Sequence, residues 1–219
     1  LNFLIIGFCM GVCNGFAIPL AHKFGAGDYR GLRAFMVNAI YLSAIFAVVM
    51  TAVTVVFCRP ILELMRTPDN IIDGAYLYIV IIFAGIPATY LYNLISAIIR
   101  SMGDSKTPVV FLVISSVMNI ALDLVFIINL HLGVAGASLA TVISQAVSGI
   151  GCLIYSWKKF EILHPDAEER RWNSSYMKTL CGMGVPMGLQ YSITAIGSVI
   201  LQSAVNTLGS NAVASMNAG

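Results

Sequence analysis

An aspartate stands inside the apolar run SSVMNIALDLVFII, at residues 115–128. Asn119 lies one helical turn before Asp123, and Ser116 lies one turn before Asn119, so the three side chains share one face of a helix. Inserting a carboxylate near the middle of a membrane costs about 2.5–3.5 kcal/mol. No Lys or Arg lies in this run to neutralise it. We therefore expect Asp123 to bind a proton or a cation, or to face water.

Further oxygen-bearing side chains recur at helical spacing on both sides of this run. They are Tyr92, Asn93 and Ser96 before it, and Ser138, Thr141, Gln145 and Ser148 after it. Carboxylate, amide and hydroxyl oxygens are the ligands of a hard cation such as sodium, and they can equally pass a proton. Such groups also join helices, at about 0.6 kcal/mol for each hydrogen bond. The pair Asp123 and Asn119 favours function, because joining helices requires no ionisable group.

The elements that carry these residues are long and apolar. Of 219 residues, 58% are hydrophobic and 10% are charged, whereas soluble domains carry about 25% charged residues. Six spanning helices are predicted, at about 1–22, 34–58, 73–99, 107–130, 134–157 and 177–208. The prediction is an all-α, multi-pass protein of the cell membrane with the lipid bilayer around it. So little polar surface excludes a nucleic-acid partner.

The Lys and Arg residues are distributed unevenly between the connectors. The first, third and fifth connectors hold ten of the 12, and the second and fourth hold Arg59 and Arg66. By the positive-inside rule the odd connectors are cytoplasmic. Asp123, about 24 Å beyond Thr107, then lies in the outer half of the bilayer. Both ends of the sequence interrupt apolar runs, so we expect a piece of a longer protein.

Turn residues and prolines subdivide the chain further. Gly27-Asp28 and Gly103-Asp104 each predict a left-handed glycine that ends one helix and an aspartate that caps the next. Pro19, Pro87 and Pro186 interrupt predicted helices, as in membrane helices that line cavities. The last helix carries a polar stripe that faces either a wet cleft or a partner helix: Gln190, Thr194, Ser198, Gln202 and Asn206.

Five cysteines and three histidines form no pattern typical of a metal centre. No CxxC motif occurs, and His22, His131 and His164 are far apart. We therefore expect no cofactor, and no metal other than a transient sodium ion at Asp123. Sodium and the proton both stay open as the ion that binds there.

Several segments in order resemble the multidrug and toxic compound extrusion (MATE) family. They are GAGD after the first helix, IIRSMGDSKTP after the third, NIALD in the fourth and GVAGASLATVISQ in the fifth. The resemblance implies a twelve-helix antiporter with two pseudo-symmetric six-helix lobes, of which this chain holds the second to seventh helices. It also implies export of cationic or amphipathic compounds in exchange for sodium ions or protons, by a monomer.

The resemblance also implies a set of site residues and a division into domains. Asn119, Asp123, Thr141 and Asn93 correspond to a cation site. Apart from the resemblance, the polar stripe of the last helix and the polar group of the third helix supply the residues expected in a substrate cleft: Gln190, Thr194, Gln202 and Tyr92. Residues 1–157 form the N-terminal lobe, 158–178 a cytoplasmic linker, and 179–219 the start of the second lobe. The linker either lies along the membrane surface or is solvated. Two alternatives stay open: a lipid-linked oligosaccharide flippase and a polytopic membrane enzyme.

Overall fold

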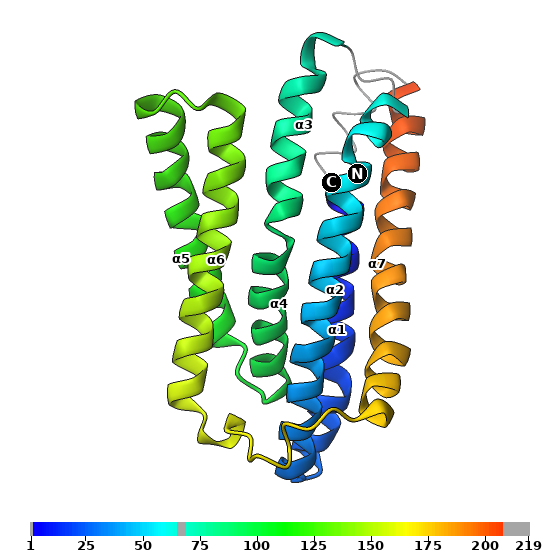
Figure 1. Ribbon diagram of the computed structural model, residues 1–219, viewed down its shortest axis with the longest axis vertical. Helices are drawn as coiled ribbons and strands as arrows, with labels where there is room; N and C mark the ends of the chain where they lie inside the picture. Colours follow the sequence, from blue (N-terminus) through cyan, green and yellow to red (C-terminus); the bar gives the residue numbers. More distant parts are fainter. Residues whose placement is uncertain (1, 65–68, 208–219) are drawn as a thin grey trace.

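A computed structural model describes residues 2–64 and 69–207, without the side chains of residues 2, 3, 61, 63, 64, 69–71, 199, 200 and 202–207 (Figure 1). In chain order the helices are α1 (Asn2–Gly25), α2 (Tyr29–Leu64), α3 (Asp69–Ala84), α4 (Ile86–Ser101), α5 (Lys106–Leu124), the π-helical turn η1 (Val125–Asn129), α6 (Gly133–Lys159), the 3₁₀ turn η2 (Glu161–Leu163) and α7 (Ser174–Thr207). The described residues contain no strand, which confirms the all-α class.

Hydropathy and length identify the helices that cross a membrane. In the described ranges, four helices are long and apolar enough: α1, α2, α5 with its π-helical turn, and α6. The pair α3 and α4 is long and apolar enough only when taken together, and its bend of 42° fits a broken span or a re-entrant loop. The chain is therefore a multi-pass membrane protein, as predicted. α7 is 34 residues long but has the lowest mean hydropathy of the described α-helices, so the sixth span stays a prediction.

The helix predicted over 73–99, with an interruption at Pro87, is divided at Gly85 into α3 and α4. A Cβ atom on Gly85 would lie 2.4 Å from a methyl carbon of Val142, so only glycine allows α6 to pack so close to the break. Pro87 stands in the first turn of α4, where its missing N–H is tolerated. The interruption expected at Pro87 thus falls two residues earlier.

The two Gly-Asp turns form as predicted. Gly27 and Gly103 have φ angles of +71° and +87°, in the left-handed region. The Asp28 and Asp104 carboxylates each accept a hydrogen bond from the backbone N–H three residues later, at 2.8 and 3.0 Å. Because these short turns end the helices, α1 continues to Gly25 and α2 begins at Tyr29, beyond the predicted boundaries.

α1 and α7 cross with their backbones in contact. A Cβ atom on Gly11 would lie 2.7 Å from the Gly188 Cα atom, and one on Gly15 would lie 2.5 Å from the Gly184 Cα atom. Small residues four apart let membrane helices approach this closely. The first and the last described helices are therefore neighbours, on the same side of the bundle (Figure 1).

The connectors divide between the two ends of the bundle as the charge count predicts. The α1–α2, α4–α5 and α6–α7 connectors lie at the same end, the lower one in Figure 1. The α5–α6 turn lies at the other end, and residues 65–68 between α2 and α3 are outside the described ranges. The basic connectors thus share one end of the helix bundle.

Candidate functional site

Asp123 lies in the last turn of α5, directly before the π-helical turn η1. Its side chain is partly buried, and its Oδ1 atom is shielded from solvent and has no hydrogen-bond partner. Most buried polar atoms in proteins are paired, and π-helical turns occur frequently at functional sites. The unpaired oxygen is therefore positioned to accept a proton or to ligate a cation.

Asn119, one turn before Asp123, reaches across to α6. Its Nδ2 atom lies 3.4 Å from the Thr141 Oγ1 atom, and the Thr141 hydroxyl donates to the carbonyl of Ala137 at 3.0 Å. The structure thus brings Asn119 and Thr141 together, with Asp123 on the same helical face as Asn119. The contact uses the amide nitrogen of Asn119 and leaves its oxygen for a ligand.

Asn93 belongs to a second polar set, between α4 and α6. Its Nδ2 atom donates to the Thr89 carbonyl at 2.8 Å, and the Thr89 hydroxyl donates to Gln145 Oε1 at 2.6 Å. Gln145 follows Thr141 by one turn on α6, so this helix joins the two sets. Sequence patterns did not single out Thr89, although it lies one turn before Asn93 and two residues after Pro87.

The three predicted cleft residues with described side chains, Tyr92, Gln190 and Thr194, lie on two different helices, α4 and α7. The Tyr92 hydroxyl donates to the Pro108 carbonyl at 2.9 Å and so joins α4 to α5. Gln190 and Thr194 are exposed on α7, where the Thr194 hydroxyl donates to the Gln190 carbonyl at 2.9 Å. The side chain of Gln202 is outside the described ones. The α7 residues thus form an exposed polar stripe. Tyr92 belongs to α4, and α1 packs between α4 and α7.

The charge of the Asp123 set limits the ions that it can hold. It contains one carboxylate, with the neutral oxygens of Asn119 and Thr141 nearby. Within residues 2–64 and 69–207, no three His, Cys, Asp or Glu side chains come together as ligands for a metal ion. A single negative charge with neutral oxygens suits a monovalent cation or a proton.

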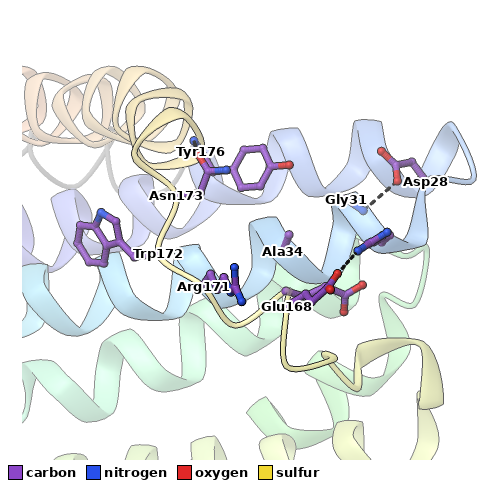
Figure 2. Close-up of a pocket in the computed structure, with 10 residues that line it drawn as sticks. Asp28, Gly31, Ala34, Glu168, Arg171, Trp172, Asn173 and Tyr176 are labelled. Atoms are coloured by element: carbon purple, nitrogen blue, oxygen red, sulfur yellow. Dashed lines mark hydrogen bonds and ion pairs between the residues drawn. The ribbon is translucent and has the colours of Figure 1, made fainter.

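A pocket of about 470 Å³ lies at the end of the bundle that carries the basic connectors, between the start of α2 and the α6–α7 connector (Figure 2). Its acids are engaged by basic side chains: Arg33 binds Glu169 through two hydrogen bonds of 2.6 and 2.8 Å, and Arg30 pairs with Glu168. The hydrogen bonds from Arg33 lower the pKa of Glu169. These pairs hold the connector on α2. Their carboxylates are already bound by arginine, whereas the Oδ1 atom of Asp123 has no hydrogen-bond partner.

Comparisons with known proteins identify the family. The MatE family profile matches residues 1–125. The chain belongs to the MatE family. It is 32% identical to "Probable multidrug resistance protein YoeA" of Bacillus subtilis, over 98% of this chain and 48% of that protein. It is 29% identical to "Probable multidrug resistance protein YpnP" of the same bacterium, again over 98% of this chain and 48% of that protein.

Solved structures of MatE transporters share the fold. A crystal structure of a MATE protein in complex with MaL6 superimposes with a TM-score of 0.89 and 26% identity. The match covers 97% of this chain and 48% of that chain. The chain thus spans about half the length of the relatives that it matches, and it carries the family's helical arrangement across that half.

Proposed function

We propose that this chain is part of a secondary active antiporter, which exports cationic or amphipathic organic compounds in exchange for sodium ions or protons. The observation that carries the proposal is the buried, unpaired Oδ1 atom of Asp123. An unpaired carboxylate oxygen inside an apolar helix has a desolvation cost, and binding of a proton or a cation relieves it. The multidrug resistance names of the relatives support the class of exported compound.

The mechanism is alternating access between an outward-open and an inward-open state. A cation that enters from outside neutralises Asp123, with Asn119 and Thr141 supplying further oxygens. Coupling requires that the cation and the compound differ in affinity between the two states. Neutralising Asp123 changes its electrostatic cost within the bundle, and this gives the cation a means to shift the equilibrium between the states.

Replacing Asp123 by Asn in the full-length protein tests the proposal. The change keeps the shape of the side chain and removes the charge, so cation-dependent efflux of a fluorescent cation such as ethidium should be lost. Efflux is measured from vesicles with imposed sodium or pH gradients. Ser116→Ala is the matched control, because the Ser116 hydroxyl donates to the carbonyl of Leu112 in its own helix. Undiminished efflux by the Asp123→Asn protein overturns the proposal.

A further inference from the structure

The guanidinium of Arg100, near the end of α4, reaches across to the middle of α1. Its Nη2 atom donates a hydrogen bond to the Oδ1 atom of Asn14 at 3.1 Å. Asn14 lies near the middle of the apolar span Leu4–Gly25, about 16 Å along the helix axis from Gly25. The contact therefore places a positive charge within the length of a membrane span, and not beyond its end.

No described acidic side chain pairs with Arg100, whereas Arg30 and Arg33 are each paired with a glutamate. Cys13 and Tyr92, which lie near enough to interact electrostatically with Arg100, are neutral at pH 7. An arginine inside a membrane span is costly unless it faces water or a polar partner, and such residues commonly mark the path of a substrate or ion. Arg100 is exposed, so a ligand can reach its guanidinium.

Asn14 joins Arg100 to Tyr191 on α7, and its amide determines which protons remain free. Its Oδ1 atom accepts from Arg100, so its Nδ2 atom points to the hydroxyl oxygen of Tyr191, at 3.4 Å. That oxygen acts as an acceptor, and the phenolic proton of Tyr191 stays available for another acceptor. A guanidinium carries five N–H donors, of which the contact with Asn14 uses one. Donors therefore remain on both sides of Asn14.

The packing of α1 against α7 holds Tyr191 in this position. The Cβ atom of Tyr191 lies 3.9 Å from the Cβ position of Gly7, which is two turns before Asn14 on the same face of α1. The tyrosine side chain thus extends along α1 from Gly7 to Asn14. Because α1 packs between α4 and α7, donors from two helices meet at one face of α1.

We propose that Arg100 and Tyr191 bind a carboxylate or phosphate group of the exported compound, and that Asn14 positions both side chains. Arginine binds such groups through paired, charge-assisted hydrogen bonds. The Tyr191 hydroxyl donates one more hydrogen bond to the same group. The bound anion supplies the negative charge that the described residues do not provide. The site therefore takes compounds that carry an anionic group beside a cationic or apolar body. This inference rests on the proposed export of organic compounds.

Two dyes that differ only at one carboxyl group test this site. Rhodamine 110 has a free carboxylate, and rhodamine 123 is its methyl ester. Their binding to the full-length protein is measured by fluorescence anisotropy in nanodiscs of phosphatidylcholine, which contain no anionic lipid. The native protein should bind both dyes. Arg100→Gln should raise the Kd of rhodamine 110 about tenfold, because hydrogen bonds to charged groups are strong, and should not weaken the binding of rhodamine 123.

Two further variants separate loss of the site from damage to the fold. Tyr191→Phe removes only a hydroxyl, at a side chain that is 40% exposed, and should raise the Kd of rhodamine 110 about threefold without a change for rhodamine 123. Lys106→Gln is the matched control, since it removes an exposed positive charge at the same end of the bundle as the end of α4. It should leave both Kd values unchanged.

The other outcomes overturn the proposal. Equal weakening of both dyes by Arg100→Gln and by Tyr191→Phe would show that these side chains only hold the helices together. A native protein that binds the ester but not the free carboxylate would refute the anion site and leave export of cationic compounds standing. Failure of the proposed function is recognised separately, by normal ethidium efflux of the Asp123→Asn protein, because the dye experiment measures binding without transport.

Discussion

At the residue scale, a buried carboxylate oxygen without a donor distinguishes Asp123 from the other described acids. Asp28 and Asp104 both accept backbone and lysine hydrogen bonds, in the turns at one end of the bundle. The sequence alone identified Asp123, because an acid in an apolar run has a high cost of membrane insertion whichever way its helix is rotated in the bundle. Its pairing with Asn119 followed from helical spacing, which needs no tertiary information.

The other predicted site residues depend on helix rotation, which the sequence does not specify. Asn93 and Tyr92 are adjacent in α4, so they point in different directions. Tyr92 turns toward α5 and Asn93 bonds back to its own helix. The break at Gly85 sets this rotation, through a contact with Val142 that lies 57 positions away in sequence. Such a contact cannot be predicted from local patterns.

Replacing Thr141 by Val tests the second oxygen of the site. The change keeps the shape and removes the hydroxyl that lies 3.4 Å from Asn119. A lost hydrogen bond or ligand is worth about 1 kcal/mol, so the half-saturating concentration of the coupling cation should rise roughly fivefold. Efflux measured against cation concentration checks this. Ser138→Ala is the control, since that hydroxyl donates within α6, to Ala135; a similar shift there contradicts the prediction.

Asp104 should make stability depend on pH. Hydrogen bonds from Thr107 and Lys159 lower its pKa from 3.8 to about 2. A group with a lowered folded pKa stabilises the protein above its unfolded pKa and loses this effect as pH falls through its folded pKa. Asp104→Asn should therefore lower Tm at neutral pH, and the difference from the native protein should shrink between about pH 4 and pH 2. A difference in Tm that stays unchanged down to pH 2 would contradict this role of Asp104.

At the element scale, the break between α3 and α4 depends on one missing side chain. Gly85→Ala would place a Cβ atom 2.4 Å from Val142, so α4 and α6 must separate or shift. Overpacking of this kind costs about 1–3 kcal/mol. The Tm in detergent should fall by several degrees, and the second change Val142→Ala should restore much of the loss. No recovery in the double variant would show that the contact is not the cause.

The α6–α7 connector shows why charge patterns leave placement open. The sequence suggested either a membrane-surface segment or a solvated linker, whereas the structure docks it on α2. Buried Asn38 accepts a hydrogen bond from the Asn173 N–H at 3.0 Å, and Glu169 is 4% exposed beneath Arg33. These partners lie more than a hundred positions apart in sequence, so no local pattern could reveal them.

Loss of the Glu169 carboxylate should release this connector. Glu169→Ala leaves the partly buried Arg33 without its two hydrogen bonds. The connector can then unfold locally around the already exposed Arg170 and Arg171, and trypsin cleavage at them should accelerate about tenfold, which corresponds to roughly 1.4 kcal/mol of lost anchoring. Cleavage is followed by gel electrophoresis of the full-length protein. Glu161→Ala, an exposed site in η2, should leave the rate unchanged; equal acceleration would contradict this role.

At the scale of the whole molecule, hydropathy predicted the multi-pass class and the charge count predicted which connectors share an end. Helix ends were less predictable: the two Gly-Asp turns were foreseen, but α1 continues through Lys23 to Gly25, because charged residues beyond the apolar run extend the helix. The division into residues 1–157, 158–178 and 179–219 stays a prediction. The packing of α7 on α1 could not be predicted from the sequence, because glycines four residues apart are common in membrane helices and do not identify the partner helix.

Gly184→Leu should separate α7 from α1. Its side chain would meet the Phe16 ring, which lies 2.4 Å from the Cβ position, and the α1 backbone beyond it. We expect a large loss of folded protein, measured by size-exclusion chromatography after solubilisation. Gly182→Leu is the matched control, because nothing lies within 4 Å of its Cβ position. Normal yield of the Gly184→Leu protein would show that the close crossing is dispensable.

The glycine crossing also constrains the order of biosynthesis. Asn14 on α1 and its contact Tyr191 on α7 are 177 residues apart, so α1 enters the membrane long before its partner helix exists. At about 5–20 residues per second, the ribosome needs roughly 10–35 s to supply α7. During that interval the surface of α1 at Gly11 and Gly15 contacts lipid or the insertion machinery in place of α7. Completion of the bundle therefore waits for the last described helix.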